Sequence, residues 1–376
     1  MRILIIAGFA DSLLNFRGVL IDYLIQQGNE VHVAAPDHDA SDGVIESLLN
    51  KGVIFHAIKL VRTGMNPLHD LKSFLQLRRL IKGNRIDVVL AYTIKPVIWG
   101  GLAARTLGIS NFYALITGLG YAFQRGGGLR NGLVYLVKIL YSSALKNAKG
   151  VIFQNSDNKQ VFVNQGIIHH KQSYLVNGSG VDLNHFEKLP LPDAPKFLLI
   201  GRLLKDKGVI EYCEAAKQVK SRCPSAEFHL VGPEDPSPNG LTISELDSYI
   251  RQGVVQYHGA AKDVRPFLKD CSIFVLPSYH EGMPRTVLEA MAMARPILTT
   301  NVPGCKETVV NGVNGWLVDK ASVEQLAERM LWFISNSEQW KMMGEQSYQM
   351  AVEKYDVHKV NAELIRIMGL SNEKTV

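Results

Sequence analysis

Short apolar runs alternate with longer segments of helical spacing along most of the chain. In the first half, the apolar runs predict strands at 3–7, 31–35, 54–58, 88–91, 112–116 and 151–154. Helical spacing predicts helices at 16–27, 68–82, 97–107 and 129–147. This alternation is typical of a parallel sheet covered by helices on both faces, so the predicted fold class is α/β.

A second series of the same kind follows a loop-rich stretch, VNGSGVD at 176–182 and LPLPDAP at 189–195. Its strands are predicted at 197–201, 228–232, 254–258, 273–277, 297–299 and 315–318. Its last helices are predicted at 323–334 and 338–353. We therefore expect two Rossmann-like domains facing a cleft, at 1–185 and 190–355, and a final helical segment at about 356–370 that crosses back to the first domain.

Ligands of such sheets bind at the carboxyl ends of the strands. In the first domain this rule points to Gly8, to 92–96 and to the stretch that begins at Thr117. The loop after the first strand, GFADSLLNFRG, lacks the G-x-G-x-x-G fingerprint, and the chain has no G-x-x-x-x-G-K-[ST] motif, which argues against an NAD enzyme and an NTPase. Gly8 either forms a tight turn or lets the backbone approach a substrate.

The segment YHEGMPRTVLEAMAM, at 279–293, turns out of an apolar strand into a helix. Its turn contains Glu281, and Glu289 lies further along the helix. A helix N-terminus at the end of a strand attracts anions, so carboxylates beside it need other partners. The hydroxyl groups of a ribose or a sugar are suited to that part, which indicates a nucleotide-sugar site. Alternatively, Glu281 is a loop charge and Glu289 lies on the helix surface.

The segment GRLLKDKG, at 201–208, also follows an apolar strand directly. Its cations, Arg202 and Lys207, come to a strand end where they could face the helix that begins near Met283. Two cations beside a helix N-terminus can neutralise a diphosphate without a metal ion. The alternative is that both are ordinary exposed charges.

In combination, G-R-x-x-x-x-K-G at 201–208 and E-x7-E at Glu281 and Glu289 resemble the retaining family 4 glycosyltransferases of GT-B fold. The resemblance covers nearly the whole chain. It includes VNGSGVD at the linker, HGA at 258–260 and NGVNGWLV at 311–318.

The resemblance implies roles for residues around a nucleotide-sugar donor. Arg202 and Lys207 would hold the donor diphosphate and stabilise it as it leaves, and Glu281 would lie against the donor sugar. These three are the catalytic candidates, and Glu289 would accept hydrogen bonds from the ribose. The other donor-binding candidates are positions whose backbone would approach the base, sugar or phosphate: Gly8, Gly201, Gly232, Gly259, Gly282, Met283 and Pro284.

The reaction that the resemblance implies moves a sugar to an acceptor hydroxyl with retained configuration. The departing phosphate would accept the acceptor's proton, since one carboxylate is expected on the ribose and the two do not form a hydrolase pair. A D-x-D pair, which holds a metal in the other main glycosyltransferase fold, occurs at Asp37 and Asp39, but its position after the second strand indicates a turn. We therefore expect no metal and no cofactor.

One position departs from the family pattern. Many relatives have a histidine just after the fifth strand, but this chain reads ALITGLGYAF there, with Thr117 at or next to that place. Whether Thr117 or a backbone group contacts the donor sugar stays open. The T-G-L-G-Y version resembles a branch that extends undecaprenyl-diphosphate-linked saccharides in bacterial envelope assembly, including enzymes that transfer N-acetylhexosamines.

The net charge of +6 is concentrated in the first half of the chain. Residues 1–185 hold 19 Lys and Arg against 11 Asp and Glu, and 60–150 holds 13 basic residues against Asp70 and Asp87 alone. Such a surface attracts nucleic acid, anionic lipid headgroups or a diphosphate, or it simply aids solubility.

The stretch 118–150 contains no acid and has apolar residues at helical spacing. A basic amphipathic helix of this kind either lies in a membrane interface or packs on its own sheet. Lys95, in YTIKP, either binds the acceptor's diphosphate or is a surface lysine with a buried stem. The acceptor-binding candidates are Arg17, Lys95, Thr117, Arg125 and Arg130.

The sequence shows no run of ~20 apolar residues, no signal-peptide pattern and no zinc or disulfide spacing among its four cysteines. We therefore expect a cytoplasmic enzyme, peripheral to the inner face of the bacterial inner membrane. It would move a sugar from a UDP-sugar to an undecaprenyl-diphosphate-linked saccharide for lipopolysaccharide, capsule or a related glycan. The alternatives are a transferase of soluble acceptors, a nucleic-acid-binding protein and a non-catalytic binding protein. Nucleic acid is not the expected partner, because interleaved aromatic and basic strands are lacking.

Overall fold

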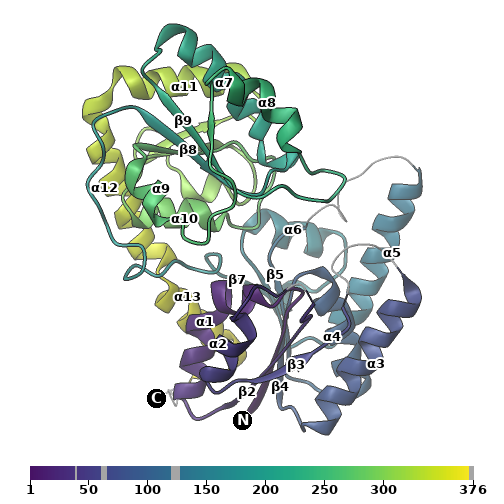
Figure 1. Ribbon diagram of the computed structural model, residues 1–376. Helices are drawn as coiled ribbons and strands as arrows, with labels where there is room; N and C mark the ends of the chain where they lie inside the picture. The colour runs from purple at the N-terminus through teal and green to yellow at the C-terminus, as the bar shows by residue number, and fades with distance from the viewer. Residues whose placement is uncertain (39, 61–65, 120–127, 372–376) are drawn as a thin grey trace. The chain divides into compact units, whose positions relative to one another are not determined.

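The computed structural model describes residues 1–38, 40–60, 66–119 and 128–371. It divides into two compact units (Figure 1). Unit 1 is Met1–Ser179 together with the chain from His358 onward, and unit 2 is Gly180–Val357. The first boundary between the units lies between 179 and 180, inside the loop-rich stretch at 176–182.

Unit 1 contains a parallel sheet of seven strands in the order β3-β2-β1-β4-β5-β6-β7. The strands are β1 (Arg2–Ile6), β2 (Glu30–Ala35), β3 (Ile54–Ala57), β4 (Val88–Tyr92), β5 (Phe112–Ile116), β6 (Gly150–Phe153) and β7 (Ser173–Leu175). The helices are α1 (Asp11–Gln26), α2 (Val44–Asn50), α3 (Pro67–Gly83), α4 (Ile94–Thr106), α5 (Gly128–Leu145), α6 (Ser156–Asn164) and α13 (Val357–Met368).

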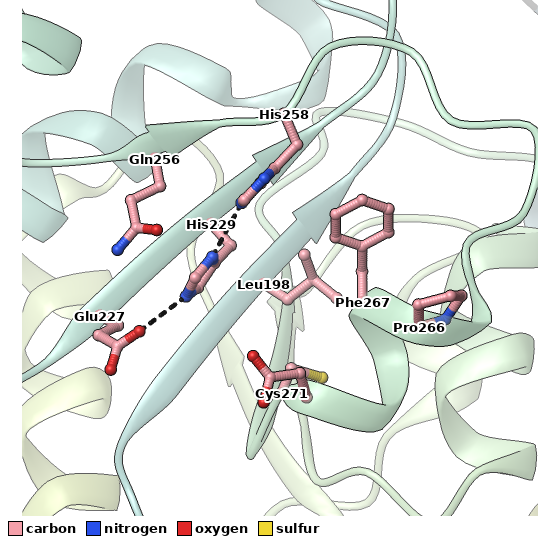
Figure 2. A pocket seen from close by; sticks show the side chains of 9 residues that line it. Leu198, Glu227, His229, Gln256, His258, Pro266, Phe267 and Cys271 are labelled. Carbon is pink, nitrogen blue, oxygen red and sulfur yellow. Dashed lines mark hydrogen bonds and ion pairs between the residues drawn. The ribbon is translucent and has the colours of Figure 1, made fainter.

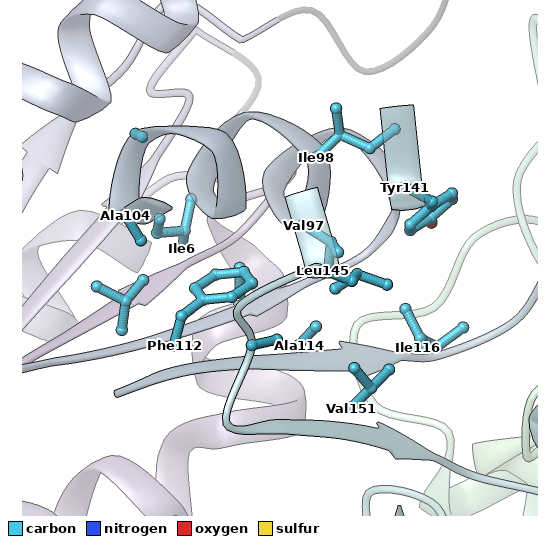
Figure 3. Packing of buried hydrophobic residues seen from close by; sticks show 14 of the residues in the cluster. Ile6, Val97, Ile98, Ala104, Phe112, Ala114, Ile116, Tyr141, Leu145 and Val151 are labelled. Atoms are coloured by element: carbon cyan, nitrogen blue, oxygen red, sulfur yellow. The ribbon is translucent and has the colours of Figure 1, made fainter. Parts of the chain in front are cut away.

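Helices cover both faces of the unit 1 sheet. Residues of α1, α2 and α13 form one buried cluster with the strands, and residues of α3, α4, α5 and α6 form the other. Figure 3 shows the second cluster, in which Phe112 and Val151 of the strands meet Val97 of α4 and Leu145 of α5. A side chain at Gly101 would place its Cβ 2.9 Å from the carbonyl oxygen of Ala144, so this glycine lets α4 pack closely on α5.

Unit 2 contains a parallel sheet of six strands in the order β10-β9-β8-β11-β12-β13. The strands are β8 (Lys196–Ile200), β9 (Glu227–Val231), β10 (Gln256–Tyr257), β11 (Ile273–Leu276), β12 (Ile297–Thr300) and β13 (Gly315–Val318). The helices are α7 (Val209–Arg222), α8 (Ile243–Arg251), α9 (Arg265–Asp270), α10 (Arg285–Ala292), α11 (Val323–Ser335) and α12 (Trp340–Met350). Parallel sheets covered on both faces are present in each unit, so the predicted α/β class is confirmed.

The segments that join the units are held by buried polar groups. In unit 2, the guanidinium of Arg295 is fully buried and donates to the carbonyl oxygens of Leu189 and Pro190 at 3.0–3.3 Å. In unit 1, the hydroxyl of Tyr113 donates to the carbonyl oxygen of Met368, at the end of α13, at 2.9 Å. The proline-rich stretch thus belongs to unit 2, and the final helix packs on unit 1.

Several predicted boundaries are wrong. Helix α1 begins at Asp11, before the predicted start at 16, so most of the stretch GFADSLLNFRG is helical. Helix α4 begins at Ile94, before the predicted start at 97, which places Lys95 in its first turn. In both helices, the apolar residues at helical spacing begin earlier in the chain than the segment over which we predicted the helix. The strand predicted at 254–258 shortens to the two residues of β10, and α2, α6 and β7 are elements that the apolar pattern missed.

Candidate active site

The carboxyl ends of four neighbouring strands carry the conspicuous motifs of unit 2. Gly201 and Arg202 follow β8, Gly232 follows β9, Gly259 lies just beyond β10, and the stretch from Pro277 follows β11. Because β10, β9, β8 and β11 are adjacent in the sheet, these segments meet at one edge.

Glycines let the loops at this edge approach one another. Gly208 has a φ of +70°, and a Cβ there would lie 2.1 Å from the carbonyl oxygen of Pro277. Gly304 has a φ of +87°, and its Cβ would lie 2.6 Å from the carbonyl oxygen of Glu281. Two reasons favour glycine at both positions: the backbone conformation is left-handed, and a side chain would clash with a carbonyl oxygen.

Lys207 and Glu281 form an ion pair between the Nζ and Oε1 atoms. The two side chains are 23% and 13% exposed, so the pair is partly shielded from water. The hydroxyl of Ser278 donates to the same carboxylate oxygen at 2.8 Å. Nearby, the amide of Tyr279 donates to the carbonyl oxygen of Asp206 at 2.8 Å. The turn that carries Lys207 is thereby fastened to the loop that carries Glu281.

Arg202 forms an ion pair with Asp235, which follows β9. The guanidinium side chain is 47% exposed, whereas the carboxylate side chain is only 6% exposed. Burial raises the pKa of Asp235, but the hydrogen bonds from Ser237 and the charge of Arg202 outweigh it and hold the pKa below its usual value. The buried carboxylate of Asp235 thus holds the Arg202 guanidinium, while much of the Arg202 side chain remains exposed to solvent.

Glu289 is buried in the second turn of α10, with 6% of the residue exposed. Burial raises the pKa of its carboxyl to about 7, and the charge of Arg285, whose Nε lies 2.8 Å from Oε1, opposes the rise. The alternative that Glu289 lies on the helix surface is therefore excluded. A buried acid that titrates near neutral pH is typical of a functional site.

The start of α10 is formed by Gly282, Met283 and Pro284, with Pro284 as the N-cap. Gly282 and Pro284 are buried, and Met283 packs against the cluster beneath the helix. On the other side of the site, the amide of Gly232 donates to the carbonyl oxygen of Gly259 at 2.8 Å, and the hydroxyl of Tyr257 donates to that of Gly232 at 2.8 Å. The loops after β9 and β10 are thus tied together.

Unit 1 brings its candidates to the ends of β1, β4 and β5, which are neighbours in the sheet. A Cβ at Gly8 would lie 3.1 Å from Oγ1 of Thr93, so the loop after β1 approaches the start of α4. The guanidinium of Arg17 is buried, with its carbon 5.3 Å from the ring centre of Tyr92. Lys95 forms an ion pair with Asp70 at 3.0 Å. Thr117 directly follows β5 and is partly buried.

Comparison with known proteins assigns this arrangement to a family. Residues 181–350 match the model "Glycosyl transferases group 1" and residues 2–155 match "Glycosyl transferase 4-like". The chain is 30% identical, over 88% of each chain, to the N,N′-diacetylbacillosaminyl-diphospho-undecaprenol alpha-1,3-N-acetylgalactosaminyltransferase of Campylobacter jejuni. The chain belongs to the family 4 glycosyltransferases. It is an enzyme that transfers sugars, as the motif segments at 201–208 and 281–289 predict.

Two further matches agree with this assignment. The glycosyltransferase is 25% identical, over 77% of each chain, to the UDP-Gal:alpha-D-GlcNAc-diphosphoundecaprenol alpha-1,3-galactosyltransferase of Escherichia coli. Its fold matches the crystal structure of Anabaena HepE in complex with UDP at a TM-score of 0.78 and 18% identity, over 98% of this chain and 100% of the other. The prediction of a GT-B fold is confirmed.

Some predicted residues lie outside what the structure describes. Arg125 and Asp39 are in undescribed segments, and for Arg130 the structure describes only its place in the first turn of α5. Within residues 1–38, 40–60, 66–119 and 128–371, no group of His, Cys, Asp and Glu has a metal-binding arrangement. Over the same residues, no helix of this glycosyltransferase is long and apolar enough to span a bilayer.

Sequence reasoning missed the partners of the motif residues. Asp235 holds Arg202, Ser278 and Asp206 fix the loop around Lys207, and Arg285 lies beside Glu289. Asp235 follows a predicted strand, so the rule that ligands gather at strand ends could have singled it out. Arg285 precedes Glu289 by four positions, a spacing that brings side chains together on a helix.

Proposed function

We propose that this glycosyltransferase moves a sugar, of the N-acetylhexosamine class, from a UDP-sugar to an undecaprenyl-diphosphate-linked saccharide with retained configuration. The observation that carries the proposal is the gathering of Arg202, Lys207, Glu281 and the buried Glu289 at one edge of the unit 2 sheet. The names of the relatives from Campylobacter jejuni and Escherichia coli, both of which act on sugars linked to diphospho-undecaprenol, support the acceptor class.

The donor diphosphate would be held by Arg202, Lys207 and the N-terminus of α10. In the step proposed, the bond from the sugar's anomeric carbon to the phosphate oxygen breaks and the bond to the acceptor oxygen forms on the same face. The acceptor's proton passes to the departing phosphate. Negative charge grows on that phosphate, so cations fixed before the reaction lower the barrier. Glu281, which holds the ammonium of Lys207, would face the sugar.

The ribose would bind at Glu289. An ionised carboxylate accepts hydrogen bonds from two hydroxyl groups, whereas a protonated one accepts less well. The charge of Arg285 lowers the pKa of Glu289, which burial raises to about 7 in total. Arg285 thereby increases the fraction of the carboxylate that is ionised near neutral pH. The base would lie against the loops of Gly232 and Gly259, on the far side of Arg202.

The acceptor lipid would be reached from a membrane surface. Large apolar side chains are 39–70% exposed on α3 and α5 of unit 1: Leu68, Leu71, Leu75, Tyr135, Leu136 and Ile139. Both helices pack against α4, so these side chains belong to one layer of unit 1 (Figure 1). The opposite face of α5 packs on the sheet through Val137, Tyr141 and Leu145. Exposed apolar residues among the cations of α3 and α5 fit an anionic bilayer, at the inner face of the bacterial membrane.

The decisive experiment incubates UDP-GalNAc, UDP-GlcNAc, UDP-Gal and UDP-Glc with an undecaprenyl-diphosphate-linked monosaccharide and reads the product by mass and anomeric NMR. We expect an N-acetylhexosamine adduct with the donor's configuration. Replacing Arg202 and Lys207 together with alanine should lower transfer by about 1,000-fold or more. The matched control replaces Lys217 and Arg222, which are exposed in unit 2, and should leave transfer unchanged. Transfer to water-soluble sugars alone, or an inverted product, would refute the proposal.

Membrane attachment has its own test. The enzyme should float with vesicles of phosphatidylglycerol and phosphatidylethanolamine. The triple variant Leu71→Ser, Tyr135→Ser, Ile139→Ser should stay at the bottom of the gradient. Leu49→Ser, a 53% exposed leucine of α2 on the other side of unit 1, should float like the unmodified enzyme. If all three proteins behave alike, the apolar layer of α3 and α5 is not the attachment surface.

A further inference from the structure

The loop at 233–241 runs beside the segment that carries Arg202. The amide of Leu203 donates to the carbonyl oxygen of Pro233 at 2.9 Å, and the amide of Leu241 donates back to the carbonyl oxygen of Leu203 at 2.8 Å. Further along, the amide of Lys205 donates to the carbonyl oxygen of Asn239 at 3.0 Å. The backbone on the carboxyl side of Arg202 is therefore held by this loop.

The shape of the loop depends on close backbone packing. The amide of Gly240 donates to the carbonyl oxygen of Ser237 at 2.8 Å. A Cβ at Gly240 would lie 1.8 Å from the carbonyl oxygen of Asp235, so the loop folds back on Asp235 more tightly than any side chain allows. The fold of the loop therefore fixes the backbone position of Asp235.

The carboxylate of Asp235 has two protein partners. One oxygen accepts the amide of Ser237 at 2.9 Å, and the other accepts Nη1 of Arg202. With its side chain 6% exposed, the carboxylate has little room to choose another rotamer, whereas the Arg202 side chain is 47% exposed. A buried, doubly bonded anion thus holds one end of an exposed cation.

We propose that Asp235 is a positioning residue, which orients the guanidinium of Arg202 for the donor diphosphate. The inference rests on the proposed function. A guanidinium has five N–H donors in a planar fork, so a carboxylate on Nη1 leaves the others for phosphate oxygens. An arginine ordered in advance loses less conformational freedom when the nucleotide binds.

The experiment is a double-mutant cycle on UDP binding, measured by calorimetry, and on sugar transfer, with KM and kcat separated. Arg202→Ala should weaken UDP binding by about 10- to 100-fold, the effect of losing a charge-assisted hydrogen bond. Asp235→Asn keeps the side-chain shape and the oxygen that accepts from Ser237. This variant should weaken UDP binding by about 3- to 30-fold. In the Arg202→Ala background, Asp235→Asn should have no further effect, because there is no guanidinium left to orient.

Asp235→Glu should restore part of the affinity, since it supplies a carboxylate again. The matched control is Asp247→Asn, which breaks an exposed Asp–Arg pair on α8 (Asp247 with Arg251, 2.8 Å) and should not change UDP binding. If Asp235→Asn weakens binding equally with and without Arg202, the residue only supports the loop and the inference is wrong. If the unmodified protein fails to bind UDP at all, the proposed function fails instead, and the two failures are distinguishable.

Discussion

The two units share a histidine arrangement at one sheet edge but enclose it differently. In unit 1, Nδ1 of His32 on β2 lies 2.9 Å from Nε2 of His56 on β3, and Glu30 lies 2.8 Å from the other nitrogen of His32. In unit 2, the same atoms of His229 and His258 are also 2.9 Å apart, with Glu227 at 3.3 Å (Figure 2). The sequences of the second strands, EVHV and EFHL, match this likeness.

The difference lies in the connection that follows the third strand. In unit 1 it is α3, of 17 residues, which packs on that face of the sheet and leaves His32 1% exposed. In unit 2 it is α9, of 6 residues, and a cavity of about 380 Å³ remains beside the imidazoles, walled by Leu198, Pro266 and Phe267. The histidine of the second strand is therefore fully covered in unit 1 and borders a cavity in unit 2, and we expect the length of the crossover helix to account for the difference.

We expect a general consequence: buried polar groups serve stability in unit 1, whereas those of unit 2 serve binding at the expense of stability. Glu289 gives the largest test. Glu289→Gln should lower sugar transfer by about 100-fold. Because the folded-state pKa of about 7 lies above the ordinary value, the protonated form favours folding below the ordinary pKa, and that advantage is lost as the pH rises through 7. The variant should therefore gain about 2–3 kcal/mol of unfolding free energy at about pH 8 and little at about pH 5.

The measurement is thermal unfolding at both pH values together with the transfer assay. Glu328→Gln, an exposed position of α11, is the matched control and should change neither quantity. A stability loss for Glu289→Gln at about pH 8 would mean that this acid is a structural anchor, and the contrast between the units would disappear.

Left-handed glycines provide the next test. Gly208→Ala in unit 2 would drive a Cβ into the carbonyl oxygen of Pro277, so we expect several kcal/mol of destabilisation and loss of transfer. Gly108→Ala in unit 1 has a similar φ, +72°, but open space around the added atom. It should cost only about 1 kcal/mol of conformational strain and leave transfer intact. The measurements are denaturant unfolding and initial rates of sugar transfer. Equal effects of the two substitutions would mean that packing at the strand ends is unimportant.

Replacing the histidines should have a smaller effect on stability, and the loss should be greater in unit 1 than in unit 2. His32→Ala removes a buried side chain that is bonded on both sides, and should destabilise unit 1 by about 3 kcal/mol. His229→Ala, whose side chain is 13% exposed beside the cavity, should destabilise unit 2 by about 1 kcal/mol. Hydrogen exchange read by mass spectrometry reports each unit separately. Equal losses would show that the length of the crossover helix does not decide the role of the pair.

The pH dependence is the smallest effect. Burial lowers the pKa of His56, His229 and His258, so the folded protein keeps these rings neutral while the unfolded chain takes up protons. Both units should lose stability as the pH falls below about 6.5. The neighbouring charges of Glu227, Lys196 and Asp270 act on His229 as well, and burial outweighs the upward effect of Glu227. Replacing His229 and His258 with glutamine should flatten the profile of unit 2 while that of unit 1 keeps its slope.

The sequence by itself determined the repeating strand and helix pattern, and with it the parallel sheets. It also determined which residues reach the strand ends, since Arg202, Lys207 and Glu281 lie in the segments that follow apolar strands. Local spacing carries this information, because a buried strand and an amphipathic helix each leave their own period in the chain. The family could be named from two short segments because G-R-x-x-x-x-K-G and E-x7-E resemble its motifs.

Only the tertiary structure decided the partners and the burial. Arg202 meets Asp235 across 33 positions and Lys207 meets Glu281 across 74, and these distances are closed by the order β9-β8-β11 in the sheet. The burial that raises the pKa of Glu289 and the cavity beside His229 likewise depend on which helix covers which face. No local period records these pairings, because they arise when segments distant in the chain pack together.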